Sequence, residues 1–289
     1  MNFTTDDGVS IYFEDSGAIE GSEAVIFAHE FAGEVDSWIG QVAALKSDYR
    51  CIAYAARGWH PSDVPEDPAA YTIERAVADM IGLLDHLGLE KAHLVGLSMG
   101  TNTVLQTALW HTGRCLSITL SSTGYGAVQN GRAEFQEACI GMSQRLLDEG
   151  WQSMAPTYGD GPFRARFKQK KPEAQAEFLR RLSGHSSIGS ALCQRGVQAT
   201  RPAFDDQEVQ LSALAIPVLL IIGDGDQPGW AGTLFLKQVI PTAGLLVMPR
   251  TGHQTNLEEP ELFNSVLANF LAEARAGTWG LNPVSASIF

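Results

Sequence analysis

The chain has 289 residues, of which 45% are hydrophobic and 18% are charged, values typical of a globular protein with a substantial core. Its formal net charge is −13, from 33 acidic and 20 basic residues, so its surface repels phosphate backbones and we expect no nucleic-acid partner. The sequence has no apolar stretch of about 18 residues and no basic start followed by an apolar segment. We therefore expect no membrane span, no signal peptide and a cytoplasmic protein.

Apolar runs of strand length recur along the chain. The first run, over residues 9–14, alternates between apolar and polar side chains and predicts an antiparallel edge strand. The later runs are apolar throughout, which is typical of parallel strands covered on both faces. They span residues 24–28, 51–55, 93–97, 116–120, 218–222 and 244–248.

Helical patterns fill the gaps between these runs. Over residues 72–88 the apolar side chains share one face, with Thr72 as a candidate N-cap and Gly88 as a candidate stop. The residues after Ser98 and residues 260–275 show a similar pattern. The alternation predicts an α/β fold, with helices on both faces of a mostly parallel sheet.

One long segment, residues 125–212, lacks a convincing strand. It is far longer than an ordinary connection of about 2–6 residues. We interpret it as a helical cap inserted in a core made of residues 1–124 and 213–289, with a separate domain as the alternative. Its helical stretches are residues 133–149, 172–182 and 187–200.

A pentapeptide, Gly96-Leu97-Ser98-Met99-Gly100, stands between a strand-like run and a helix-like run. In that setting a serine is held on a strained turn with its hydroxyl exposed, and the helix N-terminus behind it favours negative charge. Ser98 is therefore the candidate nucleophile. The alternative is that Ser98 serves only as a helix N-cap between packing glycines.

A serine nucleophile needs a base, and the base needs an orienting carboxylate. Of the seven histidines, His253 follows the last strand-like run, where catalytic groups collect in open α/β sheets. For the carboxylate, the segment Gly223-Asp224-Gly225-Asp226 directly follows residues 218–222, with Asp226 as the first candidate and Asp224 as the second. His60 and His185 are alternatives for contacting substrate.

These motifs resemble the α/β-hydrolase superfamily, in its esterase, haloperoxidase and enol-lactonase-like branch. The resemblance covers residues 8–275 outside the cap, and implies the α/β-hydrolase fold. It also implies that the acid lies three residues after a glycine, as Asp226 does after Gly223. An oxyanion hole needs two N–H donors. One would be the backbone N–H of Met99, directly after the nucleophile, and the resemblance implies that the other is the backbone N–H of Phe31. Further matching segments are residues 28–31, 56–63 and 257–260.

The sequence departs from that family at two places. Glu30 stands where relatives have glycine, and a carboxylate there would oppose the charge of an oxyanion. We expect Glu30 to turn toward solvent or a basic partner, with a substrate contact or a water-positioning role as the alternative. Ala55-Ala56 replaces a pair that commonly includes an acidic residue, which we expect to alter how that loop is anchored.

The substrate pocket is less defined by the sequence. Arg195 and Arg201 are able to clamp a carboxylate, although solvated surface arginines are the favoured interpretation. The sequence shows neither a phosphate-binding glycine loop nor a metal-ligand cluster, so we expect no cofactor and no metal. The four cysteines are expected to be buried thiols. The candidate pocket residues are Glu30, Trp38, His185, Arg195 and Trp230.

The sequence thus predicts a serine hydrolase of a small or medium carboxylic ester or lactone. One alternative is hydrolysis of a C–C bond in a diketone or vinylogous keto acid with the same residues, and perhydrolysis is a candidate side activity. Another alternative is a ligand receptor on the same fold. The apolar tail, residues 277–289, is expected to dock on its own subunit or on a neighbour, as in a homodimer.

Overall fold

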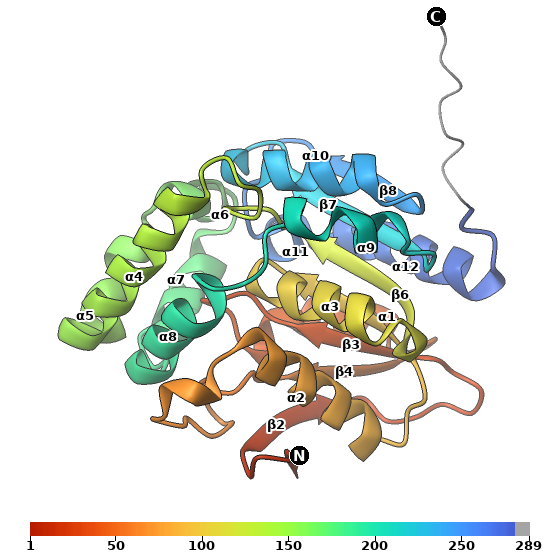
Figure 1. Cartoon of the computed structure of the whole chain (residues 1–289), viewed down its shortest axis with the longest axis horizontal. Coiled ribbons are helices and arrows are strands. Elements are labelled where there is room, and N and C mark those ends of the chain that lie inside the picture. Colours follow the sequence, from red (N-terminus) through yellow and green to blue (C-terminus); the bar gives the residue numbers. More distant parts are fainter. Residues whose placement is uncertain (281–289) are drawn as a thin grey trace, which may run out of the picture.

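The structure is a computed structural model and describes residues 1–280. In this part of the chain eight strands form one sheet, in the order β1-β2-β4-β3-β5-β6-β7-β8 (Figure 1). β2 pairs antiparallel with β1 and β4. The other strands, from β3 to β8 along the chain, are parallel to one another. The strands are β1 (Asn2–Thr4), β2 (Ser10–Asp15), β3 (Ala24–Ala28), β4 (Arg50–Tyr54), β5 (Ala92–Leu97), β6 (Cys115–Ser121), β7 (Val218–Gly223) and β8 (Ala243–Met248).

The expected α/β class is confirmed, and one strand was not expected. β1 pairs with β2 and takes the edge of the sheet, so the prediction that residues 9–14 form the edge strand is wrong. β1 has three residues, of which Phe3 alone is buried, too short a pattern to register in the sequence.

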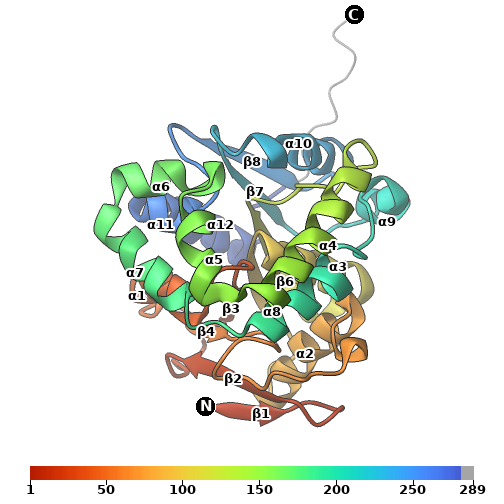
Figure 2. The same ribbon diagram turned by 90° about the vertical axis from the view of Figure 1, so that its left-hand side faces the viewer.

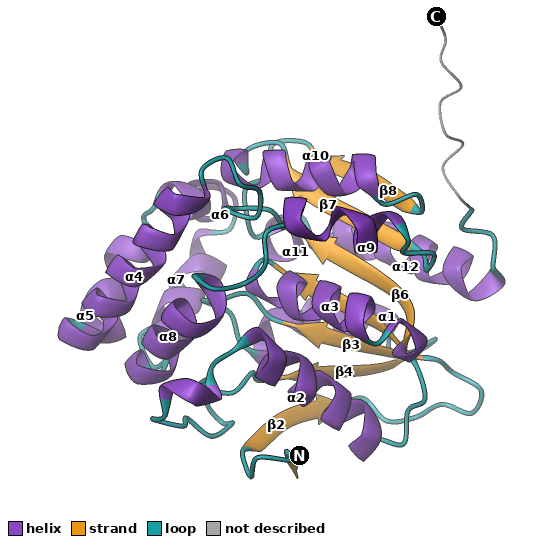
Figure 3. Ribbon diagram, in the orientation of Figure 1, coloured by secondary structure: helices purple, strands orange, loops and turns teal. Residues whose placement is uncertain are grey.

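Helices cover both faces of the sheet (Figures 1 and 3). Ile26 packs in the cluster under α2, α3 and α10, and its neighbour Phe27 packs in the cluster under α1 and α12. Alternate residues of one strand therefore face opposite helical layers, which explains the uninterrupted apolar runs. The helices of the core are α1 (Ile39–Leu45), α2 (Ile73–His86), α3 (Met99–Trp110), α9 (Glu208–Ser212), α10 (Trp230–Val239), α11 (Thr255–Glu258) and α12 (Pro260–Ala276).

Between β6 and β7 the chain forms only helices and loops, and we call the part ahead of α9, residues 122–207, the helical segment. Most of its helices stand in front of the sheet, at the carboxyl ends of the strands (Figures 1 and 2). α5 and α6 were not expected from the sequence, because each is short and bordered by glycine or proline. The helices ahead of α9 are α4 (Arg132–Asp148), α5 (Gly150–Gly159), α6 (Ala165–Lys170), α7 (Pro172–Leu182) and α8 (Ser187–Cys193).

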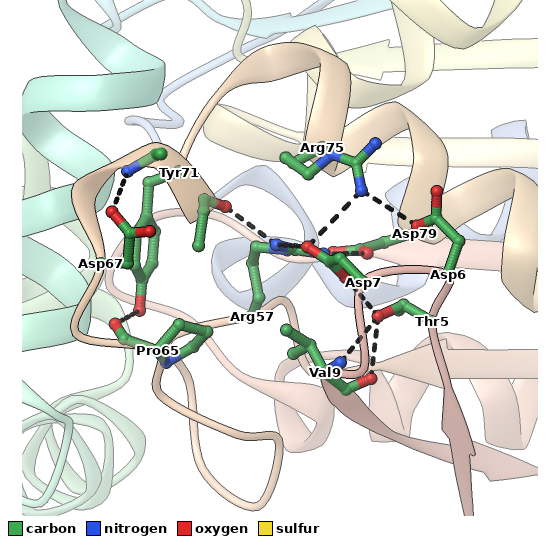
Figure 4. A network of polar contacts seen from close by, with 12 residues as sticks. Thr5, Asp6, Asp7, Val9, Arg57, Pro65, Asp67, Tyr71, Arg75 and Asp79 are labelled. Carbon is green, nitrogen blue, oxygen red and sulfur yellow. Dashed lines mark hydrogen bonds and ion pairs between the residues drawn. The ribbon is translucent and has the colours of Figure 1, made fainter.

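The loop after β4 is fixed by a buried arginine (Figure 4). The Arg57 side chain is 4% exposed and donates to both carboxylate oxygens of Asp79 in α2, at 2.8 and 2.7 Å. It also donates to Asp7, at 2.8 Å, and to the Ala70 carbonyl. The guanidinium lowers the pKa of Asp7, chiefly through their hydrogen bonds. This network joins three other segments of the core to the loop after β4 and holds that loop in place.

Two further features concern the cysteines and the C-terminal end. Cys51, Cys115, Cys139 and Cys193 are free and buried. Trp279 packs against Phe270 with ring centroids 4.7 Å apart, and donates to the Thr242 carbonyl at 2.8 Å. The rest of the expected tail contact, with Leu281 and Phe289, lies outside the described residues. Among residues 1–280, every helix is too short or too polar to cross a membrane.

Candidate active site

Ser98 lies on a strained turn between β5 and α3. Its backbone has φ 51° and ψ −110°, and its side chain makes no capping hydrogen bond to the helix. A Cβ atom at Gly96 would lie 2.7 Å from the backbone of Gly100, and one at Gly100 would collide with the Ala28 carbonyl oxygen of β3. The glycines are therefore required by close backbone approach, and the Ser98 hydroxyl is left unused by the helix.

His253 and Asp226 meet from the loops after β8 and β7. The Asp226 carboxylate accepts a hydrogen bond from His253 Nδ1 at 2.9 Å, and the Asp226 side chain is buried. Burial alone would lower the pKa of His253, but the Asp226 charge and hydrogen bond, aided by Glu30, raise that pKa above its ordinary value. Asp224 instead faces Arg166, 3.2 Å away, so it does not contact the ring.

A carboxylate that the sequence analysis missed fixes the histidine loop. Glu258 is fully buried in α11 and accepts from the backbone N–H groups of Gly252, at 2.8 Å, and Gln254, at 3.3 Å. Ser122 donates to the His253 carbonyl at 2.7 Å. The His253 backbone is thus held on both sides, so the ring keeps its position against Asp226.

The loop after β3 presents a free backbone donor. His29 Nε2 accepts from the Ala56 N–H at 3.0 Å, so its Nδ1 carries the proton and donates to the Glu30 carbonyl at 2.7 Å. Burial lowers the pKa of His29 to about 4, which keeps it neutral. Trp59 Nε1 donates to the Phe31 carbonyl at 3.1 Å. Within residues 1–280 the N–H groups of Phe31 and Met99 have no protein acceptor.

Ser98 and His253 line one cavity of about 270 Å³ beneath the helical segment. No hydrogen bond joins the Ser98 hydroxyl to the His253 ring in the described chain, but catalytic hydrogen bonds often tighten only when substrate binds. The walls are largely apolar. Residues of the helical segment in these walls include Phe135, Met142 and Phe163. The arrangement combines a hydroxyl, a histidine oriented by a carboxylate, and two N–H donors, one from the loop after β3 and one from the first residue of α3.

Glu30 forms a buried ion pair in the wall of this cavity. Its side chain is 3% exposed and accepts from Arg164 at 2.7 Å and from Gln254 Nε2 at 2.8 Å. The Arg164 guanidinium lies 4.4 Å from the centre of the Tyr158 ring. Of the two orientations expected for Glu30, the structure shows the one toward a basic partner. Arg164 was missed because a single arginine in a polar stretch gives no signal of its orientation.

Two of the expected pocket residues lie in other environments. Trp38 is fully buried against Phe27 and Phe263, at ring distances of 5.0 and 6.4 Å, because the helical turn Val35–Trp38 directs it into the core. Arg195 is exposed on the outer side of the helical segment. Neither residue lines the cavity, so these two expectations are wrong.

The other two expected pocket residues also lie away from Ser98. His185 lines a separate cavity with Glu34, whose carboxylate is 3.7 Å away. Trp230 is the first residue of α10, on the α3 side of the sheet, and does not line the cavity of Ser98. Of the five candidate pocket residues, Glu30 alone lines that cavity. Arg201, which the sequence analysis considered beside Arg195 as a carboxylate clamp, also lines it.

Comparisons with known proteins find similar sequences and structures along most of the chain. The chain is 30% identical over 242 residues to 3-oxoadipate enol-lactonase 2 of Acinetobacter baylyi, covering 83% of this chain and 85% of that protein. It is 28% identical over 260 residues to 3-oxoadipate enol-lactonase 1 of the same organism, covering 87% and 90%. It also resembles the solved structure of a thermophilic esterase from Thermogutta terrifontis with malate bound, with a TM-score of 0.83, 26% identity, and 95% and 98% of the two chains covered.

A family described as alpha/beta hydrolase fold matches residues 23–260. These residues include the strands from β3 to β8, the turn at Ser98 and the loops that carry Asp226 and His253. The family and the relatives together support hydrolase activity. The chain belongs to the alpha/beta hydrolase fold family.

Proposed function

We propose that the protein hydrolyses small or medium carboxylic esters or lactones with Ser98 as the nucleophile. The observation that carries this proposal is the His253–Asp226 hydrogen bond of 2.9 Å beside a cavity that Ser98 also lines. The names of the relatives, two enol-lactonases and an esterase, support the same substrate class.

In this mechanism His253 Nε2 takes the Ser98 proton as the Ser98 Oγ attacks the carbonyl carbon. Asp226 orients the ring and stabilises the imidazolium that forms. The tetrahedral oxyanion accepts hydrogen bonds from the N–H groups of Phe31 and Met99, each donor lowering the barrier by about 3 kcal/mol. Collapse breaks the carbon–oxygen bond, His253 protonates the leaving oxygen, and an acyl-Ser98 ester remains.

The second half of the cycle repeats these steps with water. His253 deprotonates a water molecule as it attacks the acyl-Ser98 carbonyl, and the same two N–H groups hold the oxyanion. The proton on His253 returns to Ser98 Oγ as the acid leaves. For a lactone, the leaving alcohol stays covalently attached to the acid product.

A second candidate is hydrolysis of a C–C bond in a diketone or vinylogous keto acid. The observation that favours it is Arg201 in the cavity wall, where a guanidinium is able to hold an acidic substrate. In that reaction the leaving group is a carbon atom that must be protonated. Product analysis separates the two, because ester hydrolysis yields an alcohol and C–C hydrolysis yields a ketone or a second acid.

The proposal is tested with a fluorophosphonate probe followed by peptide mass spectrometry. We expect the wild-type protein to carry the label on Ser98 and the Ser98→Ala variant to remain unlabelled. An unlabelled wild-type protein would overturn the enzyme proposal and favour a ligand receptor. A panel of 4-nitrophenyl esters, lactones and diketones then identifies the bond that is cleaved.

A further inference from the structure

Arg201 is a buried cation without an acidic partner. It is 5% exposed, and no carboxylate in residues 1–280 lies within ion-pair distance of its guanidinium. Arg164 lines the same cavity and is also buried, but unlike Arg201 it forms an ion pair with Glu30. Moving an unpaired charge out of water costs several kcal/mol, so a buried arginine without a carboxylate is an exception that needs a reason.

The groups that accept hydrogen bonds from the Arg201 side chain are neutral. One terminal nitrogen donates to Gln198 Oε1 at 2.6 Å and the other donates to the Tyr125 carbonyl. The Phe135 ring lies 4.5 Å from the guanidinium carbon, while the buried Nε atom has no hydrogen-bond partner. These contacts hold the guanidinium in place but leave donor capacity and the whole charge unneutralised.

The surrounding charges increase the need for an anion. The neighbouring Arg132 donates to the Arg201 carbonyl, and its positive charge opposes that of Arg201. Burial, as the main cause, lowers the pKa of Arg201 to about 10, so it remains protonated near neutral pH. With His253 neutral, the lining of the cavity holds two arginines and one carboxylate, a formal charge of +1 in a chain whose net charge is −13.

We propose that Arg201 binds a carboxylate of the substrate, so that Ser98 acts on the ester or lactone of an acid that carries a second, ionised carboxyl group. This inference rests on the proposed function. A purely structural role explains the contacts less well, because a neutral glutamine is able to bond to the Gln198 and Tyr125 oxygens without burying a charge. A bound carboxylate supplies the partner that Glu30 supplies to Arg164.

The test uses matched substrates that differ in charge alone. Monomethyl glutarate carries a carboxylate, and methyl 4-carbamoylbutanoate carries an amide of the same shape. We expect wild-type kcat/KM, followed by acid release, to favour the charged ester by about 10- to 100-fold, the range for a hydrogen bond to a charged group. The same comparison is made with half-esters of malonic, succinic and adipic acid, each with its amide partner. The chain length with the largest preference for charge indicates the spacing between Arg201 and Ser98.

Arg201→Gln should remove most of this preference, and Arg201→Lys should keep part of it, because lysine retains the charge without the planar fork. The matched control is Arg195→Gln, which removes an exposed arginine six residues earlier in the helical segment and should keep the wild-type preference. Equal rates on the charged and neutral esters at every chain length, or an unchanged preference in Arg201→Gln, would overturn the inference.

A binding measurement separates this inference from the proposed function. Calorimetry with monomethyl glutarate on the Ser98→Ala variant should show binding that weakens at least about tenfold when Arg201→Gln is added. Such binding without hydrolysis by the wild-type protein would overturn the proposed function and support the role of Arg201. Hydrolysis of neutral esters with no binding of the half-ester would do the reverse.

Discussion

At the scale of single residues, Ser98, the proposed nucleophile, has an unfavourable backbone conformation. Its φ of 51° with ψ of −110° lies in a region that glycine adopts easily and other residues do not. Such a conformation costs about 1–3 kcal/mol, which the surrounding strand and helix must supply. The strain comes from the backbone angles at residue 98 and would affect any residue with a Cβ atom at this position.

Ser98→Gly should therefore be more stable than Ser98→Ala, although both variants lack the proposed nucleophile. We expect a difference of about 1 kcal/mol in the free energy of unfolding, since glycine relieves the strain but gains entropy in the unfolded chain. Urea unfolding of the two variants measures it. Equal stability of the two variants would show that the turn is not strained.

The acid limb of the activity profile should report His253. A base must be neutral to act, so kcat/KM should fall as pH drops through the pKa of His253, which the Asp226 carboxylate holds above its ordinary value. Asp226→Asn should move this limb to lower pH and reduce the plateau by about 10³- to 10⁴-fold. Asp224→Asn is the control, because Asp224 does not contact the ring and should leave the limb in place.

Whether the sequence located a residue of the candidate site depends on the element that carries it. Ser98, Asp226 and His253 each lie within five residues of the end of a strand, so their places at the sheet edge depend on local pattern alone. Arg164 and Arg201 lie in the helical segment, where the cavity-facing side depends on how the helices dock. Arg195 and Arg201 therefore look equivalent in the sequence, although the structure buries only Arg201.

At the scale of elements, the parallel strands were predicted to within one or two residues because each is a continuous apolar run. β1 was missed because a single buried side chain, Phe3, gives no period. The helix over Ile73–His86 was predicted well, since Thr72 caps it by accepting from the Arg75 N–H. Short elements without caps or period, such as α5 and α6, depend on tertiary contacts that a single sequence does not display.

α3 packs closely against β3 at Gly100, where the backbones of the two elements meet. Gly100→Ala would place a methyl group against the Ala28 carbonyl, a backbone atom that cannot move without shifting the sheet. We expect a loss of more than about 4 kcal/mol in the free energy of unfolding, at the extreme of single substitutions. Chemical denaturation measures it.

Gly40→Ala is the matched control for that substitution. Gly40 lies in α1 with open space around the built Cβ position, so alanine should stabilise the helix by up to about 1 kcal/mol. A Gly100→Ala variant as stable as Gly40→Ala would contradict the proposed close approach of α3 and β3.

At the scale of the whole molecule, ion pairs connect the helical segment to the core. Arg181 in α7 contacts both Glu34 and Asp36, which follow β3. Lys170 pairs with Glu259 in a similar way. Because partly exposed pairs each contribute about 1 kcal/mol or less, these contacts bias the position of the segment without locking it.

Arg181→Ala should let α7 open more often. We expect amide hydrogen exchange in α7 to accelerate by up to about fivefold, the equivalent of 1 kcal/mol, with the sheet unaffected. Arg180→Ala is the control, since among residues 1–280 Arg180 forms an ion pair only with Glu177 of the same helix. Equal exchange in the two variants would show that the contacts with Glu34 and Asp36 do not restrain the segment.

The buried cysteines allow the opening of the helical segment to be measured by thiol alkylation. Cys51 lies in β4 of the core, and Cys193 lies in α8, with its thiol 3.4 Å from the Met99 sulfur across the boundary between segment and core. Burial raises the pKa of both thiols, so neither reacts with an alkylating reagent until its surroundings open. The ratio of their alkylation rates compares release of the helical segment with unfolding of the sheet, in the natural sequence and without an added label.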